Sequence, residues 1–232
     1  MDCVNSEKNN KPAYFIVEGN IGAGKSTFLR LLKESFNINI VYEPLDEWQM
    51  VGEGENILER FYQDTPRWAY TFQTYAFLTR IAKQERQLDP TYINVVERSV
   101  YSDRYCFAKN CFELGLMSGL EWELYRKWFE WLVDEYDVLP NGFIYLRTSP
   151  DVAFSRLKKR HREEEKVVAL SYLNSINNKH EEWLVKKENI RSALVPIPVL
   201  IVDCNQDFEN DPAVFAKIKE QISQFMKLSP LK

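Results

Sequence analysis

One eight-residue string restricts the fold of this chain more than any other feature of its sequence. Residues 19–26 read Gly-Asn-Ile-Gly-Ala-Gly-Lys-Ser and match the pattern G-x-x-x-x-G-K-[ST] in full. Glycines in this pattern let the backbone wrap phosphate groups with its N–H groups pointing inward. The string follows an apolar run at 13–17 and precedes an amphipathic helical segment, which is the context that the pattern requires. The predicted nucleoside triphosphate site consists of Gly19, Asn20, Ile21, Gly22, Ala23, Gly24, Lys25, Ser26 and Thr27.

Two residues of this loop have predicted roles of their own. Lys25 is expected to reach the β- and γ-phosphates of the nucleotide, and the Ser26 hydroxyl is expected to ligate Mg²⁺. A signalling GTPase is disfavoured, because no glycine of the chain has an aspartate three residues before it. The string at 178–181, Asn-Lys-His-Glu, also lacks the final aspartate of a guanine-binding motif. These absences favour a small kinase with a separate acceptor pocket.

Five short apolar runs alternate with longer segments of helical period. The runs lie at 13–17, 38–42, 92–96, 143–146 and 199–202. Strands that alternate with helices favour a parallel sheet covered by helices on both faces. The predicted fold class is therefore α/β, a P-loop kinase with a five-stranded parallel sheet. The polar residues 1–12 are expected to form a flexible N-terminus, and 13–232 a single domain.

Composition excludes several other classes of protein. Thirty Lys and Arg against 34 Asp and Glu give a net charge of −4, whereas nucleic-acid proteins that bind phosphates by bulk charge are usually basic. No run of 18 apolar residues predicts a membrane span. The first residues have neither the apolar core of a signal peptide nor the arginines of a transit peptide, so we predict a cytoplasmic protein. Four scattered cysteines and two histidines fit no zinc pattern.

Charged residues follow two of the predicted strands at their carboxyl ends, where open α/β sheets bind ligands. Glu43 follows the run at 38–42 and is placed to accept a proton from an acceptor hydroxyl. Glu97 and Arg98 follow the run at 92–96. The carboxylate could position Mg²⁺, while the guanidinium could steady an anion or the reacting hydroxyl. Trp48, five residues after Glu43, is expected to form one wall of the acceptor pocket.

Helical spacing brings a second set of side chains onto common faces. Gln73 and Arg80 are seven residues apart, about two turns, with Phe72 beside them. Asp103 and Phe107 are four apart on the next predicted helix. A glutamine amide can pair with the edge of a nucleobase, and aromatic rings can stack on its face. Arg80 and Asp103 are expected to form an ion pair at the bottom of this base pocket.

A basic run at 158–166 is the compositional outlier of the chain. Arg156 and Arg160 share a predicted helix face, and Arg162 lies just beyond. We expect an arginine-rich lid at about 158–168 that closes over the triphosphate, since mobile arginines can stabilise a transferring phosphoryl group. Glu164 and Glu165 follow at once and could hold a sugar hydroxyl.

Six strings of the sequence, taken in chain order, resemble those of the deoxynucleoside kinases of the deoxycytidine/deoxyguanosine kinase type. The strings that carry the resemblance are Glu18-Gly-Asn-Ile-Gly-Ala-Gly-Lys-Ser-Thr27, Glu43-Pro-x-x-x-Trp48, Arg67-Trp-x-x-Thr-Phe-Gln-Thr-Tyr75, Glu97-Arg-Ser-Val-Tyr-Ser-Asp-Arg-Tyr105, Arg162-x-Glu-Glu165 and Lys179-His-Glu-x-Trp183. They extend from about residue 13 to residue 228. The resemblance implies Mg²⁺-dependent transfer of the γ-phosphate of ATP to the 5′-hydroxyl of a deoxynucleoside, in nucleotide salvage. It also implies a homodimer, for which the aromatic helical segment 121–136 is a candidate interface.

The resemblance further implies a role for each matching residue. The acceptor residues are Glu43 and Arg98 at the 5′-hydroxyl, Tyr62 and Glu165 at the 3′-hydroxyl, Gln73 at the base edge, and Phe107 and Trp48 packing the base. The donor residues are the lid arginines Arg156, Arg160 and Arg162, with the loop Asp207-Phe208 at the base of the donor. Either Glu43 or Glu97 could be the catalytic base, and proximity to the hydroxyl favours Glu43.

Arg80 and Asp103 also bear on substrate preference. Thymidine-preferring relatives carry a small residue in place of Asp103, whereas an aspartate can bind an exocyclic amino group and a charged pair crowds the thymine methyl. We therefore predict deoxycytidine and deoxypurines over thymidine. Two rival classes are a nucleoside monophosphate kinase, which would need arginines for the acceptor's phosphate, and a silent nucleotide-binding protein, which would not need Glu43, Glu97 and Arg98 together.

Overall fold

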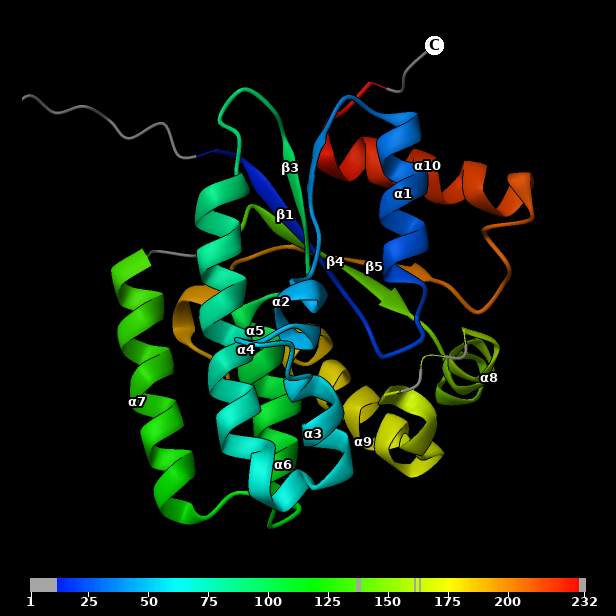
Figure 1. The fold of residues 1–232 in the computed structure, drawn as a ribbon. Coiled ribbons are helices and arrows are strands. Elements are labelled where there is room, and N and C mark those ends of the chain that lie inside the picture. Colours follow the sequence, from blue (N-terminus) through cyan, green and yellow to red (C-terminus); the bar gives the residue numbers. More distant parts are fainter. Residues whose placement is uncertain (1–11, 137–138, 161, 163, 230–232) are drawn as a thin grey trace, which may run out of the picture.

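The computed structural model of the chain describes residues 12–136, 139–160, 162 and 164–229 (Figure 1). The predictions made for residues 1–11 and for positions 161 and 163 of the lid lie outside the described residues. None of the described helices is both long enough and apolar enough to cross a membrane.

The sheet has five parallel strands, as the alternation of apolar runs predicts. In chain order they are β1 (Tyr14–Glu18), β2 (Asn39–Val41), β3 (Asn94–Glu97), β4 (Gly142–Arg147) and β5 (Val199–Asp203). Their order in the sheet is β2-β3-β1-β4-β5, so β1 is central and its carboxyl end lies between those of β3 and β4. The observed boundaries differ from the predicted ones by one or two residues. This topology places the phosphate loop, which follows β1, beside Glu97 and Arg98, which end β3.

Alternate side chains of the central strand serve two separate cores. Phe15 and Val17 pack under α1 (Lys25–Ser35) and α10 (Pro212–Met226) on one face of the sheet. Tyr14 and Ile16 pack on the other face, which carries α4 (Thr65–Gln87) and α7 (Gly119–Tyr136). Figure 1 shows these two helical layers on either side of the strands. Both faces of the sheet are therefore covered, which explains why the strands read as continuous apolar runs.

The remaining helical segments lie in the connections between the strands. They are α2 (Leu45–Gln49), α3 (Ile57–Gln63), α5 (Val100–Ser102), η1 (Asp103–Ala108), α6 (Lys109–Glu113), α8 (Pro150–Arg160), η2 (Glu164–Val167), α9 (Leu170–His180), η3 (Glu181–Val185) and η4 (Ser192–Leu194). The segment η1 is a π-helical stretch that continues α5 directly into α6. Asp103 and Phe107, for which we predicted an ordinary helix, both lie in this π-helical stretch. Such wider turns are frequent at functional sites.

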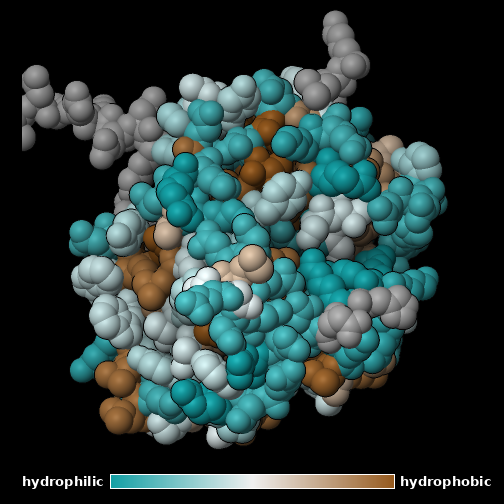
Figure 2. Space-filling view, in the orientation of Figure 1, coloured by the Kyte–Doolittle hydropathy of each residue, from teal (hydrophilic) through white to brown (hydrophobic). Residues whose placement is uncertain are grey.

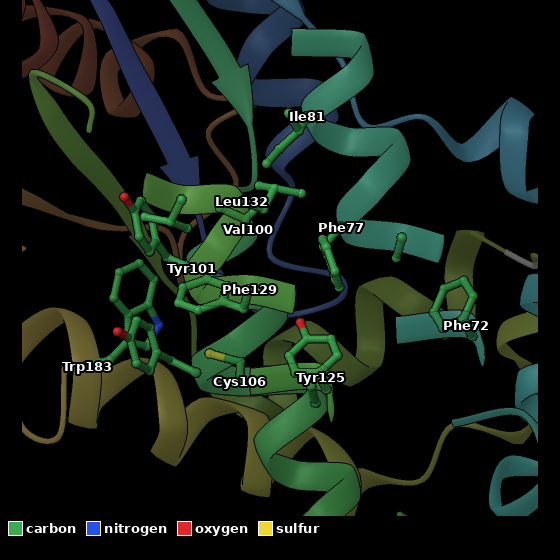
Figure 3. Close-up of a cluster of buried hydrophobic side chains, with 14 of the residues drawn as sticks. Phe72, Phe77, Ile81, Val100, Tyr101, Cys106, Tyr125, Phe129, Leu132 and Trp183 are labelled. Atoms are coloured by element: carbon green, nitrogen blue, oxygen red, sulfur yellow. The ribbon is translucent and has the colours of Figure 1, made fainter. Parts of the chain in front are cut away.

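An aromatic cluster fixes the helices on the acceptor side of the sheet (Figure 3). Tyr101 packs edge-on against Phe129, and Phe77 against Tyr125, with ring centroids 6.1 and 5.2 Å apart. Trp183 contacts the same cluster from η3. Because protein interiors of this kind are close-packed, the helices that carry the candidate site have little freedom to shift.

Candidate active site

A cavity of about 780 Å³ lies at the carboxyl edge of the sheet and is large enough for a small-molecule substrate. Most of the predicted site residues line it. They are Ile21, Gly22, Gly24, Lys25, Ser26, Thr27, Glu43, Trp48, Tyr62, Phe72, Gln73, Arg80, Glu97, Arg98, Asp103, Phe107, Arg156, Arg160, Arg162, Glu165, Asp207 and Phe208. Gly19, Asn20 and Ala23 do not line the cavity and are buried; Gly19 lies against Leu146 of β4, and Asn20 Nδ2 donates to the Leu173 carbonyl of α9 at 2.8 Å. The fold therefore gathers the predicted donor and acceptor residues around one space.

The phosphate loop is held by close backbone packing. Gly22 has φ +78°, and a Cβ there would lie 2.3 Å from the carbonyl oxygen of Ala153 in α8. Gly24 has φ +93°, and its Cβ would lie 2.8 Å from the Phe208 ring. Both positions exclude a side chain for steric and conformational reasons. Phe208, predicted to hold the donor's base, thus also supports the loop that would hold its phosphates.

Lys25 lies across this loop with its ammonium group buried. Nζ donates to the backbone oxygens of Gly19 at 3.3 Å and Asn20 at 2.9 Å. Burial, followed by the positive charge of Arg98, lowers the pKa of Lys25 to about 7. An anion placed in the loop would reverse this effect, because opposite charge favours the protonated amine.

Ser26 and Glu97 present two oxygens to the same point of the cavity. Ser26 Oγ donates to Glu97 Oε1 at 3.0 Å, joining the start of α1 to the end of β3. Two ligands of one Mg²⁺, each about 2.0–2.1 Å from it and at right angles, lie about 2.9 Å apart. The described residues contain no cluster of three or more His, Cys, Asp or Glu that could hold a metal by themselves. The pair therefore fits Mg²⁺ in the way this ion is usually bound, by one or two protein oxygens together with phosphates.

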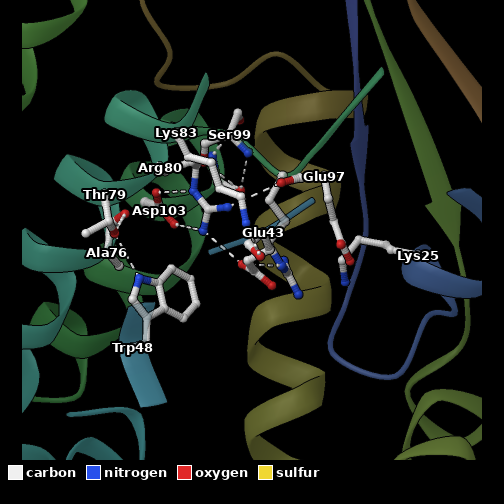
Figure 4. Close-up of polar contacts among 12 residues, drawn as sticks. Lys25, Glu43, Trp48, Ala76, Thr79, Arg80, Lys83, Glu97, Ser99 and Asp103 are labelled. Atoms are coloured by element: carbon white, nitrogen blue, oxygen red, sulfur yellow. Dashed lines mark hydrogen bonds and ion pairs between the residues drawn. The ribbon is translucent and has the colours of Figure 1, made fainter. Parts of the chain in front are cut away.

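Glu43 is held between two guanidinium groups (Figure 4). Its Oε1 accepts from Arg80 Nη2 at 2.9 Å and lies 3.4 Å from Arg98 Nε. Burial by itself would raise the pKa of Glu43, but the charges of Arg80, Arg98 and Lys25 outweigh it and hold the pKa below its usual value. Glu43 is thus a largely buried carboxylate, with its side chain 13% exposed, that stays ionised and can accept a hydrogen bond from a hydroxyl.

Arg98 adopts a backbone conformation that is unusual for its residue type. Its φ of +61° lies in the left-handed region, which costs energy for a residue with a side chain. The guanidinium lies over the Phe107 ring, with Cζ 4.7 Å from the ring centroid. This turn at the end of β3 directs the side chain toward Glu43 and the cavity.

The base-binding side of the cavity is built on α4 and η1. Arg80 donates to Asp103 through Nε at 2.8 Å and Nη2 at 3.0 Å, so the predicted ion pair is present and bidentate. Asp103 and Glu43 outweigh the effect of burial and raise the pKa of Arg80. Trp48 donates through Nε1 to Thr79 Oγ1 at 2.9 Å, which fixes the orientation of this wall.

Gln73 and Phe72 complete this part of the pocket. Gln73 is buried and lines the cavity, and no other described side chain forms a hydrogen bond with its amide. Phe72 packs edge-on against Trp48, with ring centroids 5.4 Å apart. The Gln73 amide is the polar group that this otherwise aromatic wall offers to a ligand.

The lid arginines divide into two groups. Arg160 and Arg162 both pair with Glu165, the latter at 3.6 Å. Arg156 instead lies over the Phe208 ring, 5.6 Å from its centroid, and donates to the Gln206 carbonyl at 2.9 Å. The Glu165 carboxylate therefore connects two of the lid arginines, Arg160 and Arg162, to the acceptor side of the cavity.

The expectation that Glu164 could hold a sugar hydroxyl together with Glu165 is wrong for Glu164. Its carboxylate does not line the cavity. Oε1 accepts from Gln49 Nε2 at 2.7 Å and from Asn56 Nδ2 at 3.1 Å, on either side of the turn between α2 and α3. The two amides already satisfy this oxygen, so it is not available to a sugar hydroxyl. Glu164 instead attaches the lid segment to the acceptor side.

Sequence reasoning missed several residues that line the cavity. Tyr172 of α9 and the apolar pair Leu58 and Phe61 of α3 lie on the acceptor side, and Asn205 and Asn210 on the donor side. The spacing of three between Leu58 and Phe61 is a helical signal that predicts a buried face, but not which cavity that face borders. Nothing in the local sequence around Tyr172 predicts its position.

Fold and site together define a P-loop phosphotransferase of the α/β class with an adjoining acceptor pocket. A family model for deoxynucleoside kinase matches residues 15–227. The chain is 37% identical to a mitochondrial deoxyguanosine kinase of Xenopus laevis, with 96% of this chain and 93% of the relative covered. It is 38% identical to deoxycytidine kinase 2 of Gallus gallus (90% and 89% covered) and 35% identical to the mitochondrial thymidine kinase 2 of Homo sapiens (93% and 80% covered). The chain belongs to the deoxynucleoside kinase family and is an ATP-dependent phosphotransferase of that class.

Proposed function

We propose that this chain transfers the γ-phosphate of ATP to the 5′-hydroxyl of a 2′-deoxynucleoside. The observation that carries the proposal is the ionised Glu43, held by Arg80 at 2.9 Å and Arg98 at 3.4 Å in the same cavity as the phosphate loop. A carboxylate in that position suits a neutral hydroxyl acceptor. The guanidinium groups beside it, Arg80 and Arg98, already pair with this carboxylate and so are not free arginines for the phosphate of a monophosphate acceptor.

The described residues divide the reaction between them. Lys25 and the backbone N–H groups of residues 19–26 bind the donor phosphates, and Arg160 and Arg162 offset charge on the transferring group. Gln73 orients the base so that the 5′-hydroxyl meets Glu43, which accepts its proton as the oxygen attacks. Ser26 and Glu97 would hold Mg²⁺, which when bound would neutralise charge on the donor phosphates. The catalytic base must contact the reacting hydroxyl. We therefore assign this role to Glu43, which is expected to lie closer to the hydroxyl, and the role of metal ligand to Glu97.

The remaining contacts supply sugar and donor recognition. Tyr62 and Glu165 line the cavity and are assigned to the 3′-hydroxyl, with Trp48 and Phe107 packing the base. Asp207 and Phe208 are assigned to the base of ATP. Because Glu165 also pairs with Arg160 and Arg162, a sugar hydroxyl that donates to this carboxylate would couple acceptor binding to the lid.

We further infer that deoxycytidine and deoxypurines are preferred over thymidine. Asp103 keeps free lone pairs on both oxygens beyond its bidentate pair with Arg80, and these can accept from an exocyclic amino group. Thymine offers a carbonyl and a methyl group at that position instead, which leaves the charged pair without a compensating contact. The relatives include kinases named for deoxyguanosine, deoxycytidine and thymidine, so their names do not decide which base is preferred. The inference therefore depends on Arg80 and Asp103.

The proposed homodimer interface lies on α7 and the adjoining part of α4. Leu120, Trp128 and Trp131 of α7 are 71%, 49% and 53% exposed, and Leu78 of α4 is 43% exposed. Figure 2 shows apolar surface along the edge of the molecule where α7 lies. Exposed patches rich in large apolar side chains are typical of protein–protein interfaces. The cytoplasmic location stays a prediction.

A coupled assay of ADP release tests this function. Mg²⁺-ATP is combined with deoxycytidine, deoxyadenosine, deoxyguanosine, thymidine or deoxycytidine monophosphate as acceptor. Turnover of the first three and little of the last two supports the whole proposal, whereas robust thymidine turnover would refute only the base preference. Turnover confined to the monophosphate would overturn the choice of acceptor. A Glu43→Gln variant with near-normal kcat would overturn the choice of base.

A further inference from the structure

We propose that Glu18 is a positioning residue for phosphoryl transfer, which acts through Ser99 to hold Arg98 in its left-handed backbone conformation. The inference rests on the proposed function, because Arg98 is assigned there to the reacting hydroxyl. Glu18 is the last residue of β1 and immediately precedes the phosphate loop. It is fully buried and does not line the cavity, so it cannot touch either substrate directly.

The hydroxyl of Ser99 links Glu18 to the residue after Arg98. Ser99 Oγ donates to Glu18 Oε1 at 2.5 Å. The same Oγ accepts from the Ser102 backbone N–H at 3.3 Å, as the N-cap of α5. A serine hydroxyl has one proton, so the cap leaves that proton for Glu18. Glu18 is thus the acceptor of this link when its carboxyl group is ionised, and the carbonyl oxygen of the protonated acid can accept in the same way.

Arg98 is held from both sides by this arrangement. Its backbone N–H donates to the Val17 carbonyl at 2.9 Å, which continues the β1–β3 ladder past Glu97. One residue later, Ser99 is held by Glu18, the neighbour of Val17 on β1. A left-handed backbone at a residue with a side chain persists only where its surroundings fix it, and these two contacts with β1 do so. The conformation aims the Arg98 guanidinium at Glu43.

Two buried polar atoms without hydrogen-bond partners, one in Glu18 and one in Arg98, also support the proposal. Within the described chain, Glu18 Oε2 and Arg98 Nη1 are both buried without a hydrogen-bond partner. A carboxyl group retained at such a cost is expected to have a role beyond packing. Ser102 adds to the same unit, since its Oγ donates to the Ser99 carbonyl at 2.9 Å.

Steady-state kinetics on three single variants test the proposal. Glu18→Ala and Ser99→Ala should each lower kcat by roughly tenfold to a hundredfold, the loss expected when a reacting group is misplaced. The KM for ATP should stay within about twofold, because the phosphate loop itself is intact. Glu18→Gln should recover most of the loss, since its amide oxygen can still accept from Ser99. Because both alanine variants remove the same link, Glu18→Ala/Ser99→Ala should be no slower than the worse single variant.

Asn94→Ala is the matched structural control. Asn94 is fully buried on β3 and forms several hydrogen bonds, but at the opposite end of the strand from Arg98. It should lower the Tm and leave kcat unchanged. If Glu18→Ala behaves like Asn94→Ala, or if the double variant loses the product of the single effects, Glu18 does not act through Ser99.

Two further measurements keep these outcomes separate from other failures. If Glu18→Ala does not fold, Ser99→Ala, which keeps the carboxyl group in place, decides the question by itself. In an Arg98→Ala background, Ser99→Ala should cause no further loss of kcat, and an undiminished loss would refute the route through Arg98. Failure of the proposed function would instead appear as absent turnover by the unmodified chain in the same assay.

Discussion

Removing Arg80 should destabilise the protein far more than removing any surface arginine. Arg80 is only 3% exposed and bonds to Asp103 at 2.8 and 3.0 Å and to Glu43 at 2.9 Å. Arg80→Met keeps most of the side-chain volume but leaves the Asp103 carboxylate buried without its cation. Breaking a buried ion pair in this way costs about 3–5 kcal/mol. For a chain of this size that corresponds to a fall in Tm of roughly 6–20 °C.

A second substitution separates this electrostatic cost from a simple loss of packing. Adding Asp103→Ala to Arg80→Met removes the unpaired carboxylate, so the double variant should be more stable than Arg80→Met alone by about 1–3 kcal/mol. Glu43 keeps Arg98 as a cation at 3.4 Å in both variants. Arg60→Met is the control, since Arg60 forms an exposed pair with Glu55 and should lose at most about 1 kcal/mol.

Urea denaturation without substrate at several pH values measures both effects. In Arg80→Met, Asp103 should titrate at a raised pKa because it is buried without a cation. The folded state then binds more protons than the unfolded state, so stability should fall as the pH rises from about 5 to 8. The double variant lacks this group and so lacks the part of the slope that Asp103 adds to that of the other buried groups. A double variant no more stable than Arg80→Met, or the same pH profile for Arg80→Met and the double variant, would refute the reasoning.

Three further outcomes are expected from single groups. Burial lowers the pKa of Lys25 to about 7, so the binding of tripolyphosphate at pH 8 should be accompanied by uptake of a proton. Calorimetry in buffers of different ionisation enthalpy measures this uptake. If the uptake persists in Lys25→Met, the proton is not taken up by Lys25. Burial also raises the pKa of Glu18 from 4.5 to about 7, so the folded state keeps this proton up to a higher pH than the unfolded state does. The stability of the unmodified chain relative to Glu18→Gln should therefore fall by about 3 kcal/mol between pH 4 and 8. Denaturant titrations at several pH values measure this difference. Glu164→Ala should raise the KM for the deoxynucleoside several-fold and leave the KM for ATP unchanged, because it releases Gln49 and Asn56 but no phosphate contact; equal changes in both KM values would show that Glu164 acts on the lid alone.

Local and periodic features of the sequence were sufficient for the fold class and the phosphate loop. Residues 19–26 are contiguous, and their function depends on backbone that they form themselves, so the motif predicts its own structure. The five apolar runs predict the strands because a parallel sheet covered on both faces demands continuous apolar residues. Gln73 and Arg80 share a face of α4 for an equally local reason, the period of the helix.

The tertiary structure decided which of the candidate groups meet. Glu164 and Glu165 are adjacent and alike in sequence, yet one bonds to Gln49 and Asn56 and the other to Arg160 and lines the cavity. Such choices depend on which groups the fold brings within hydrogen-bonding distance, and no local pattern encodes those distances.

The left-handed turn at Arg98 and its link to Glu18 have the same origin. Glu18 and Ser99 are 81 residues apart and become neighbours only because β1 pairs with β3. The sequence determined which chemical groups are available at the carboxyl edge of the sheet. Strand pairing and helix packing determined their partners, their orientation and their ionisation, because these depend on contacts between segments distant in the chain.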